Sequence, residues 1–340
     1  MNEFKVITVK DEWCKELTDY RSDWYHSWDY HEMAFKNNEG KPILFVLTND
    51  SNESIALPLL LRNITGSEHK DMTSVYGYPG FLLSSDDAIN LFEQFLEHLL
   101  VWSNNNSVVS IFSRLNSLLV DANALKGCFP NGETVVVDLS NDEDEQKRRY
   151  RKNYRNLLRR LEKDGFKADW SNSQESIDDF KSIYLATMKG LDAGDYYFFD
   201  DAYYDDLLNS TGFEVRIYNV WLNEIKVCSG MFVFCDDIVQ YHLSGTLQEY
   251  KDLAPTRMLI DQARKDATEL GFKYLHLGGG LGGGRDSLFN FKYGFSKESI
   301  EFFVFKMITN MDAYKELSNL TEVDAVPESG YFPLYRKVNE

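Results

Sequence analysis

A run of cationic residues is the strongest chemical feature of the 340-residue sequence. Lys147–Lys163 holds nine cationic side chains and one acidic side chain, a local charge of +8. The whole chain has a formal net charge of −18, so the remainder carries −26. Because arginine forks match phosphate oxygens in bidentate fashion, Arg151 and Arg155 are candidate ligands for an anion. The alternatives are a solvated helix neutralised by the acidic segment Asp192–Asp206, contact with a membrane surface, or contact with RNA.

A glycine run forms a second candidate site. The segment HLGGGLGGGRD has six glycines in seven positions and formally matches G-x-G-x-x-G at Gly278, Gly280 and Gly283. No repeating βαβ pattern surrounds it, and no P-loop Lys-Ser/Thr pair follows it, which argues against a dinucleotide or ATP site. So many glycines still indicate that the backbone passes close to another group or moves over it.

A lysine among aromatic residues follows the glycine run. Lys292 has Phe291, Tyr293 and Phe295 as near neighbours in the sequence. A lysine in apolar surroundings either has a perturbed pKa or extends its ammonium group to water. The sequence leaves both interpretations open.

The elements that position these residues form two similar series. The first half predicts two helices, a hairpin, a strand, a helix and two strands: Asp11–Asp19, Trp24–Phe35, Ile43–Thr48, Ser54–Arg62, Ser74–Phe81, Asp87–Ser103, Val108–Phe112 and Thr134–Leu139. The second half predicts a hairpin with a third strand, then helix, strand, helix and strand: Glu214–Leu222, Lys226–Phe234, Ile238–Ser244, Pro255–Leu270, Lys273–Leu277, Ser287–Tyr293 and Ile300–Ile308. We therefore expect two α+β units joined near residues 140–165.

Composition excludes several classes of protein. Apolar residues make up 43% and aromatic residues 14% of the chain, which is enough for packed cores. The acidic balance argues against a general nucleic-acid coat, and we expect no DNA partner. The N-terminus lacks a signal-peptide pattern, and the apolar runs reach only strand length. The four cysteines are scattered without zinc spacing, so we expect reduced thiols, no metal site and a cytoplasmic protein.

Several segments resemble one family. YHLSGTLQEYKDLAPTRMLIDQA, GFKYLHLGGG and DSLFNFKYGFS resemble the second half of the Fem-type aminoacyltransferases and their acyltransferase relatives in the GNAT superfamily. RKNYRNLLRRLEKDGF resembles the basic helix that links the two halves in that group, and DMTSVYGYPGFLL resembles the central strand of the first half. The resemblance runs from about Trp28 to Lys306.

The resemblance implies a tandem arrangement. We expect an α+β chain of two GNAT-like folds, each with a mixed central sheet flanked by helices. The expected domains are 1–145 and 166–340, with a basic linking helix over 146–165. Typical members attach an amino acid from aminoacyl-tRNA to a cell-wall precursor, and relatives acylate sugar amines. The chain lacks the long heptad stretch of many cell-wall members.

The resemblance also implies residues that bind the acyl donor. The family lysine of the F-K-x-G-F motif matches Lys292, accompanied by Phe291, in the active-site channel. Gln248–Thr256 lacks the glycines with which acyl-CoA enzymes hold pyrophosphate. The predicted helix start still offers free N–H groups at Thr256 and Arg257, and the Arg257 charge, to an anion.

Residues that assist the chemistry follow from the same resemblance. In GNAT folds a splayed central strand supplies a backbone donor to the oxyanion, here around Tyr241–Ser244. His242 and Tyr241 are candidate proton acceptors, and His276 closes a neighbouring strand; each histidine is either functional or structural. Aromatic faces suit sugar rings, so a set of aromatic residues is expected to line the acceptor site: Trp28, Tyr76, Tyr78, Tyr196 and Tyr197.

Three functions remain open at this point. The first is N-acyl or aminoacyl transfer from acyl-CoA or aminoacyl-tRNA to an amine of an amino sugar or cell-envelope precursor, free or lipid-linked. The second is a non-catalytic protein that binds an anionic glycan or nucleotide-sugar. The third is a peripheral protein that docks on the inner face of a membrane through Lys147–Lys163. In each case we expect no tightly bound cofactor.

Overall fold

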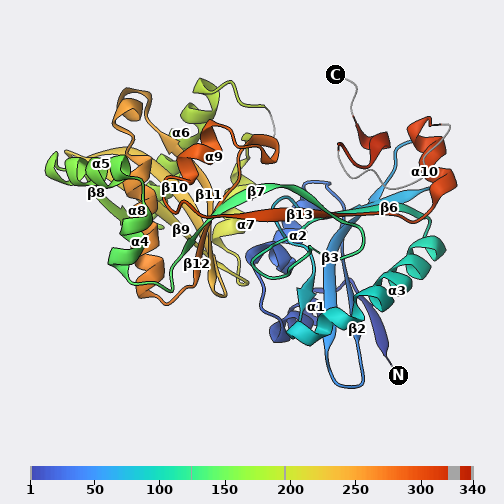
Figure 1. Ribbon diagram of the computed structural model, residues 1–340. Helices are drawn as coiled ribbons and strands as arrows, with labels where there is room; N and C mark the ends of the chain where they lie inside the picture. The colour runs from blue at the N-terminus through green and yellow to red at the C-terminus, as the bar shows by residue number, and fades with distance from the viewer. Residues whose placement is uncertain (1, 124, 195–196, 321–329, 338–340) are drawn as a thin grey trace. The chain divides into compact units, whose positions relative to one another are not determined.

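The computed structural model describes residues 2–123, 125–194, 197–320 and 330–337 (Figure 1). The chain divides into two compact units. Unit 1 comprises Met1–Gly132 and Glu301–Glu340, and unit 2 comprises Glu133–Ile300. This division differs from the expected domains because the C-terminal residues return to the first unit. Val304–Ile308 pair antiparallel with Ser110–Arg114, which accounts for that return.

Unit 1 is a mixed sheet with helices on its faces. The strand order is β1-β2-β3-β4-β6-β13, and β5 pairs with β3. Only the β4–β6 pairing is parallel among the described pairings of this unit. The strands are β1 (Glu3–Ile7), β2 (Lys41–Thr48), β3 (Ser54–Asn63), β4 (Lys70–Thr73), β5 (Leu82–Leu83), β6 (Val108–Arg114) and β13 (Ser299–Ile308). The helical segments are α1 (Lys10–Glu16), η1 (Leu17–Asp19), η2 (Trp24–His26), α2 (Trp28–Lys36), η3 (Asp86–Leu91), α3 (Phe92–Asn105), α10 (Met311–Ser318) and η7 (Leu334–Arg336).

Strand β2 shows why this sheet is covered on both faces. Its successive side chains point to opposite faces of the sheet. Phe45 packs in a cluster with Phe95 and Leu99 of α3, whereas Leu44 packs in a second cluster with Trp13 of α1. The continuous apolar run of β2 is therefore the signature of a strand buried on two sides.

Unit 2 has the same kind of architecture. Its strand order is β7-β12-β11-β10-β9-β8, with β11 and β12 parallel and the other described pairings antiparallel. The strands are β7 (Cys128–Asp138), β8 (Lys167–Trp170), β9 (Glu214–Leu222), β10 (Ile225–Cys235), β11 (Ile238–Thr246) and β12 (Tyr274–Gly278). The helical segments are α4 (Glu143–Arg149), α5 (Lys152–Lys163), α6 (Gln174–Gly190), α7 (Asp201–Leu208), η5 (Gln248–Leu253), α8 (Thr256–Glu269), η6 (Leu281–Gly283) and α9 (Ser287–Lys292).

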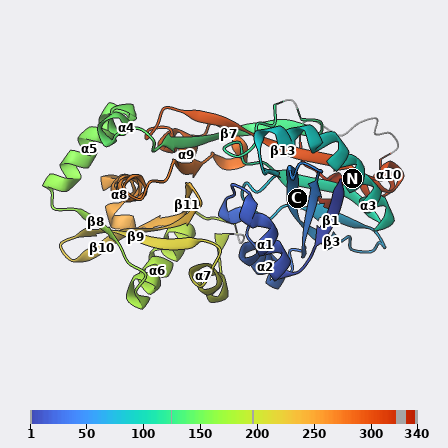
Figure 2. The same ribbon diagram turned by 90° about the horizontal axis from the view of Figure 1, so that it is seen from below.

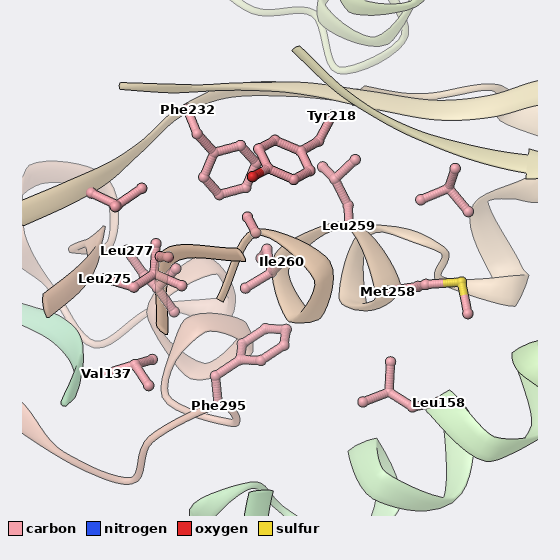
Figure 3. Close-up of a cluster of buried hydrophobic side chains, with 14 of the residues drawn as sticks. Val137, Leu158, Tyr218, Phe232, Met258, Leu259, Ile260, Leu275, Leu277 and Phe295 are labelled. Atoms are coloured by element: carbon pink, nitrogen blue, oxygen red, sulfur yellow. The ribbon is translucent and has the colours of Figure 1, made fainter. Parts of the chain in front are cut away.

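The core of unit 2 lies between its sheet and α8. Figure 2 shows α8 on one side of β9 and β10, and α6 and α7 on the other. Figure 3 shows Leu259 and Ile260 of α8 facing Tyr218 and Phe232 of the sheet, in one buried cluster. Ala263 and Ala267 of α8 belong to the same buried cluster, whereas Leu270 at the end of the helix is exposed. The expected α+β fold, with mixed sheets flanked by helices, is confirmed.

Two predicted elements are wrong. The basic run is not one helix, because Tyr150 and Arg151 are extended (ψ 148° and 142°) between α4 and α5. Tyr150 is buried and donates to Asp261 Oδ1 at 2.9 Å, which fixes the break. Ser74–Phe81 is not a strand, since β4 ends at Thr73 and the segment contains positive φ angles at its glycines.

Candidate functional site

Two parallel strands part at their carboxyl ends in unit 2. The parallel register joins Ile238–Gln240 of β11 to Tyr274–His276 of β12 and ends there within the described residues. Strand β11 nevertheless continues to Thr246. Gln240 Oε1 and His276 Nδ1, 2.7 Å apart, form the last side-chain link before the strands separate. Ligands of open α/β sheets bind outside such carboxyl ends.

A bulge lies at the point of separation. Met231 of β10 pairs with Leu243, but the next residue, Phe232, pairs with Tyr241, so His242 is the extra residue on β11. A bulge bends its strand and redirects the neighbouring backbone groups. The structure thus places a distorted central strand at Tyr241–Ser244, the stretch expected to supply an oxyanion donor.

Lys292 ends α9 with its ammonium group held inside the protein. The residue is 9% exposed, and Nζ donates to the carbonyl oxygen of Gly279 at 2.7 Å. Burial lowers the pKa of Lys292 to about 8. Of the two interpretations left open by the sequence, the perturbed lysine is therefore the one that the geometry supports.

The glycine run lets the backbone approach that ammonium group. Gly278 has φ +75°, and a Cβ atom there would lie 3.3 Å from Lys292 Nζ. The run is fixed by Asp286, which accepts from Leu281 N at 3.0 Å and caps α9 through Phe289 N at 2.8 Å. Gly278 and Gly279 therefore allow the backbone to contact the ammonium group of Lys292.

The two candidate histidines are neutral groups. Burial and the nearby Lys292 charge lower the pKa of His276 to about 3. Burial likewise lowers the pKa of His242 to about 3, and His242 Nε2 lies 2.6 Å from the hydroxyl of Tyr203 on α7. Burial raises the pKa of Tyr241, whose hydroxyl is hydrogen-bonded to Ser244 Oγ. These shifts favour positioning roles over proton uptake at neutral pH.

The N-terminus of α8 carries an arginine held by two aromatic rings. The guanidinium carbon of Arg257 lies 4.3 Å from the ring centre of Tyr154 and 5.3 Å from that of Phe291. Its Nε is buried without a hydrogen-bond partner, and no described carboxylate forms an ion pair with it. Thr256 Oγ1 lies 3.0 Å from Thr246 Oγ1, which ties the start of α8 to the end of β11.

The backbone before α8 replaces the missing glycines in an unexpected way. Ala254 takes the left-handed conformation, with φ 52° and ψ 50°, a position that usually requires glycine. Of the two N–H groups expected to be free, that of Arg257 instead donates to the carbonyl oxygen of Ala254 at 3.3 Å. The macrodipole still favours an anion at this helix start. An unpaired guanidinium at the second helical residue adds a full positive charge to that field.

The start of α5 joins this region. Tyr154 donates to the carbonyl oxygen of Phe291 at 2.8 Å, and the Arg151 guanidinium carbon lies 5.9 Å from the ring centre of Tyr293. Arg155 Nη1 donates to the carbonyl oxygen of Arg148 at 3.4 Å. Tyr154 of α5 thus lies with Arg257 of α8 and Phe291 of α9, whereas the printed contact of Arg155 is with Arg148.

Two of the predicted acceptor aromatics of unit 1, Tyr76 and Tyr78, both lie close to Tyr25. Trp28 packs on Trp13 (ring centres 5.5 Å apart) and lines a pocket of about 450 Å³. Tyr78 packs on Phe302 (5.3 Å), and Tyr76 is 45% exposed beside Arg114. In unit 2, the carbonyl oxygen of Tyr197 accepts from Tyr184 Oη at 3.1 Å. Tyr196 lies outside the described residues. Their grouping into an acceptor site stays a prediction.

Sequence reasoning missed three partners of the site. Asp286 carries a signal that a search for helix caps would find, because aspartate precedes the helical residues of α9. Tyr154 recurs with apolar residues at helical spacing, a pattern that predicts packing and indicates no partner. Tyr203 lies 39 residues from His242 in the chain, and no local pattern joins the two.

The described residues contain neither a metal-binding cluster nor a membrane-spanning helix. No group of three or more His, Cys, Asp or Glu side chains in the described part of the chain is arranged to hold a metal ion. None of its helices is both long enough and apolar enough to cross a membrane.

Comparison with known families agrees with this geometry. Residues 148–292 match the family of acetyltransferase (GNAT) domains. The matched residues all lie in unit 2. The match begins in α4 and ends at Lys292, so it spans the diverging strands, α8 and α9. The expectation of an acyltransferase is supported for this domain. No curated protein matches the chain.

Solved structures extend the similarity beyond the GNAT domain. FemX superposes with a TM-score of 0.68 at 14% identity, over 92% of this chain and 99% of FemX. L-PGS from Bacillus licheniformis gives 0.55 at 12% identity, over 89% of this chain and 93% of that one. The C-terminal domain of a putative lysylphosphatidylglycerol synthetase from Agrobacterium fabrum gives 0.50 at 13% identity, over 79% and 84%. At these identities the likeness concerns the fold, and it confirms the expected Fem-type arrangement.

Proposed function

We propose that the chain is an N-acyltransferase that moves an acyl group from acyl-CoA to an amine. The observation that carries the proposal is the separation of β11 from β12 beside a helix start with an unpaired arginine. The thioester of acyl-CoA would lie between the strand ends, and the phosphates of its coenzyme A part would bind at Thr256 and Arg257. The acceptor is an amine of an amino sugar or a cell-envelope precursor.

The chemistry is a direct displacement at the acyl carbon. The neutral amine attacks the thioester carbonyl, a C–N bond forms, and the carbonyl oxygen becomes an oxyanion in the tetrahedral intermediate. Backbone N–H groups of the bulged stretch Tyr241–Ser244 and the ammonium of Lys292 would stabilise that charge. The C–S bond then breaks, and the thiolate takes up the proton released by the amine.

The position of Lys292 suits a donor better than a base. With a pKa of about 8 it is mostly protonated at pH 7, and it already donates to Gly279 O. An ammonium in a buried site stabilises a developing negative charge more strongly than one in water. Before the attack, the protonated acceptor therefore loses one proton to water or to another group and becomes the neutral amine.

Aminoacyl-tRNA is the alternative donor. Its ester could be attacked in the same geometry, and FemX shares the fold. We favour acyl-CoA because the family that matches residues 148–292 is one of acetyltransferases, and because Arg257 offers phosphate binding that compensates for the missing glycines. The acidic remainder of the chain also opposes RNA.

Thermal unfolding with millimolar CoA and acetyl-CoA tests the donor. A ligand at 100 times its Kd stabilises the folded protein by about 2.7 kcal/mol, so we expect a clear rise in Tm. Arg257→Ala should abolish the rise. Arg114→Ala is the matched control, because Arg114 of unit 1 also lies over two rings, at 5.5 and 5.8 Å.

A turnover assay separates the remaining functions. Release of free CoA thiol in the presence of amino sugars would support the transferase. Stabilisation by CoA without turnover on any amine would favour the binding-protein alternative. No response to CoA, together with transfer from aminoacyl-tRNA, would contradict acyl-CoA as the donor.

A further inference from the structure

Helix α5 carries a stripe of cations without described acidic partners, in contrast to α4 beside it. In α4 the cations are paired: Lys147 with Glu143 at 2.8 Å, Arg148 with Glu145 at 2.7 Å, and Arg149 with Glu298 at 2.6 Å. None of the α5 cations forms an ion pair with a described residue. The stripe consists of Lys152, Arg155, Arg159, Arg160 and Lys163.

These five residues form one face of the helix. Their spacing of i, i+3, i+7, i+8 and i+11 places them on one side, over about 16 Å of helix length. All are exposed except the half-buried Arg155. The opposite face is buried through Tyr154, Leu158 and Leu161 in the core of unit 2. The helix therefore lies flat on the unit and turns its charge outward.

The described residues of the acidic segment Asp192–Asp206 form no ion pair with the stripe. Its described ion pairs reach α6, where Lys181 lies 2.8 Å from Asp201 and 4.0 Å from Asp205. Keeping several like charges together without partners opposes folding through their repulsion. An external anion that binds the folded protein would offset that cost.

From this stripe we infer that α5 docks the protein on a membrane surface that contains anionic phospholipids. Lipid headgroups move laterally and can gather under one short, straight row of cations. A folded RNA has fixed phosphates and needs basic residues on several elements to follow its backbone. Here the stripe lies on one helix of a chain with net charge −18, which favours the lipid surface.

The strand after α5 adds residues suited to an interface. Lys167 of β8 is exposed, and Trp170 is 42% exposed with the Arg216 guanidinium carbon 4.6 Å from its ring. Figure 1 shows α5 and β8 at the same end of unit 2. Tryptophan and cationic side chains are the residue types that gather at the level of lipid headgroups.

Docking would place the proposed transfer site near the lipid surface. Tyr154, on the buried face of α5, contacts Arg257 at the start of α8. The two faces of a helix are about 10 Å apart, so the donor site lies within roughly one helix diameter of the docked headgroups. The inference itself does not depend on the acyl donor.

Co-sedimentation with lipid vesicles tests the inference. The probe vesicles are phosphatidylcholine alone, and phosphatidylcholine with about one third phosphatidylglycerol, at low and physiological salt. We expect binding to the anionic vesicles only, weaker at higher salt. Reversing Arg159, Arg160 and Lys163 to Glu should weaken that binding about a hundredfold or more, since each cation near the surface contributes about fivefold.

A charge-matched variant controls for net charge. Lys15→Glu, Lys41→Glu and Lys189→Glu make the same change in net charge at exposed lysines of α1, β2 and α6, and this triple variant should sediment like the wild type, apart from a small effect of net charge. Replacing the three stripe residues by Gln gives a milder variant, and the Tm of every variant shows whether it is folded.

Two results would overturn the inference. One is a vesicle assay in which the wild type does not bind anionic vesicles, or in which a folded stripe variant binds them as well as the wild type does. The other is binding to a tRNA-length RNA that needs the stripe while vesicles are ignored, which would assign α5 to nucleic acid. The rise in Tm that CoA causes in the stripe variant is measured separately and shows whether the acyl-donor site is intact.

Discussion

The two units each contain one parallel strand pair, and only one of these pairs opens. In unit 2, β11 and β12 separate after Gln240 and His276. In unit 1, the parallel pair β4 and β6 stays joined beyond β4, because Ser74 N donates to Phe112 O at 2.9 Å and Arg114 N donates to Ser74 Oγ at 3.3 Å. With this shared topology we therefore expect a ligand site only where the hydrogen bonds stop.

The helices that follow β4 in unit 1 and β11 in unit 2 differ in the charge of their first turns. The start of η3–α3 carries Asp86, Asp87 and Glu93, and no cation occurs between Ser85 and Glu93. The first turn of α8 has no acidic residue and contains Arg257. Acidic side chains satisfy a helix start internally, whereas a cation leaves it available for an external anion. Unit 1 keeps the architecture and lacks the electrostatics of a donor site.

The largest expected effect comes from replacing the buried lysine of unit 2. Lys292→Met should lower kcat/KM about 10²- to 10³-fold, the usual loss when one donor to an oxyanion is removed. Lys306→Met is the control, because Lys306 is a buried lysine of unit 1 whose pKa is also lowered by burial. Steady-state kinetics with both folded variants check the prediction. Equal losses would show that the effect is structural, and an unchanged kcat/KM for Lys292→Met would remove Lys292 from the mechanism.

The next effect concerns the closed strand ends of unit 1. Gly77 has φ +113°, and a Cβ atom there would lie 2.1 Å from the buried ring of Tyr25. Gly77→Ala should therefore lower the free energy of unfolding by about 3 kcal/mol, through backbone strain and the clash. Gly282→Ala of unit 2 is the matched comparison, because its φ is +62° and its Cβ would meet open space. Its cost should be about 1 kcal/mol, as measured by chemical denaturation.

A smaller effect separates the two protonation states of Lys292. The native pKa of about 8 lies below the ordinary value of 10.5, so between these values the unfolded chain binds more protons than the folded one. The free energy of unfolding of the wild type should therefore rise with pH across this window. The shift corresponds to about 3 kcal/mol at pH 7, and loss of the hydrogen bond to Gly279 O offsets about 1–2 kcal/mol of it. Lys292→Met should therefore be about 1–2 kcal/mol more stable than the wild type at pH 7, and this advantage should be lost as pH rises toward 10.5.

Activity should respond to the same titration. If the protonated side chain of Lys292 donates a hydrogen bond to the oxyanion, kcat falls as pH increases through about 8. A rise of kcat through that pH would instead make Lys292 a base. Denaturation curves and a pH–rate profile of the same preparation measure both consequences.

The sequence predicted much of what local patterns determine. Pro255 and Gly271 bracket α8, and the hairpin β9–β10 turns at Asn223 and Glu224 as its pattern indicates. The lysine of the F-K-x-G-F segment was found from its motif, and the structure supplied its reason, a buried contact with Gly279 O. These features depend on neighbours in the chain.

Features that depend on distant residues could not be predicted. The break between α4 and α5 is fixed by Tyr150 and Asp261, which are 111 residues apart. The return of β13 to β6 joins residues almost 200 positions apart, and a strand pattern does not specify its partner. The pairing of Arg257 with Tyr154 and Phe291 was invisible for the same reason.

The smallest expected effect tests the contrast between the two helix starts. Asp86 and Asp87 lie in the first turn of η3, which continues into α3, so their charges interact favourably with the N-terminal end of the helix macrodipole. Asp86→Asn with Asp87→Asn should lower the free energy of unfolding by about 0.5–1 kcal/mol at low salt, and by less at high salt because the interaction is screened. Neutralising these residues removes the internal anion but adds no arginine like Arg257 and leaves the strand ends closed. The variant should therefore give the same CoA response as the wild type in thermal unfolding. A new, additional CoA site in the variant would show that Asp86 and Asp87 alone prevent CoA from binding to unit 1. It would also show that open strand ends, like those of unit 2, are not required for CoA binding.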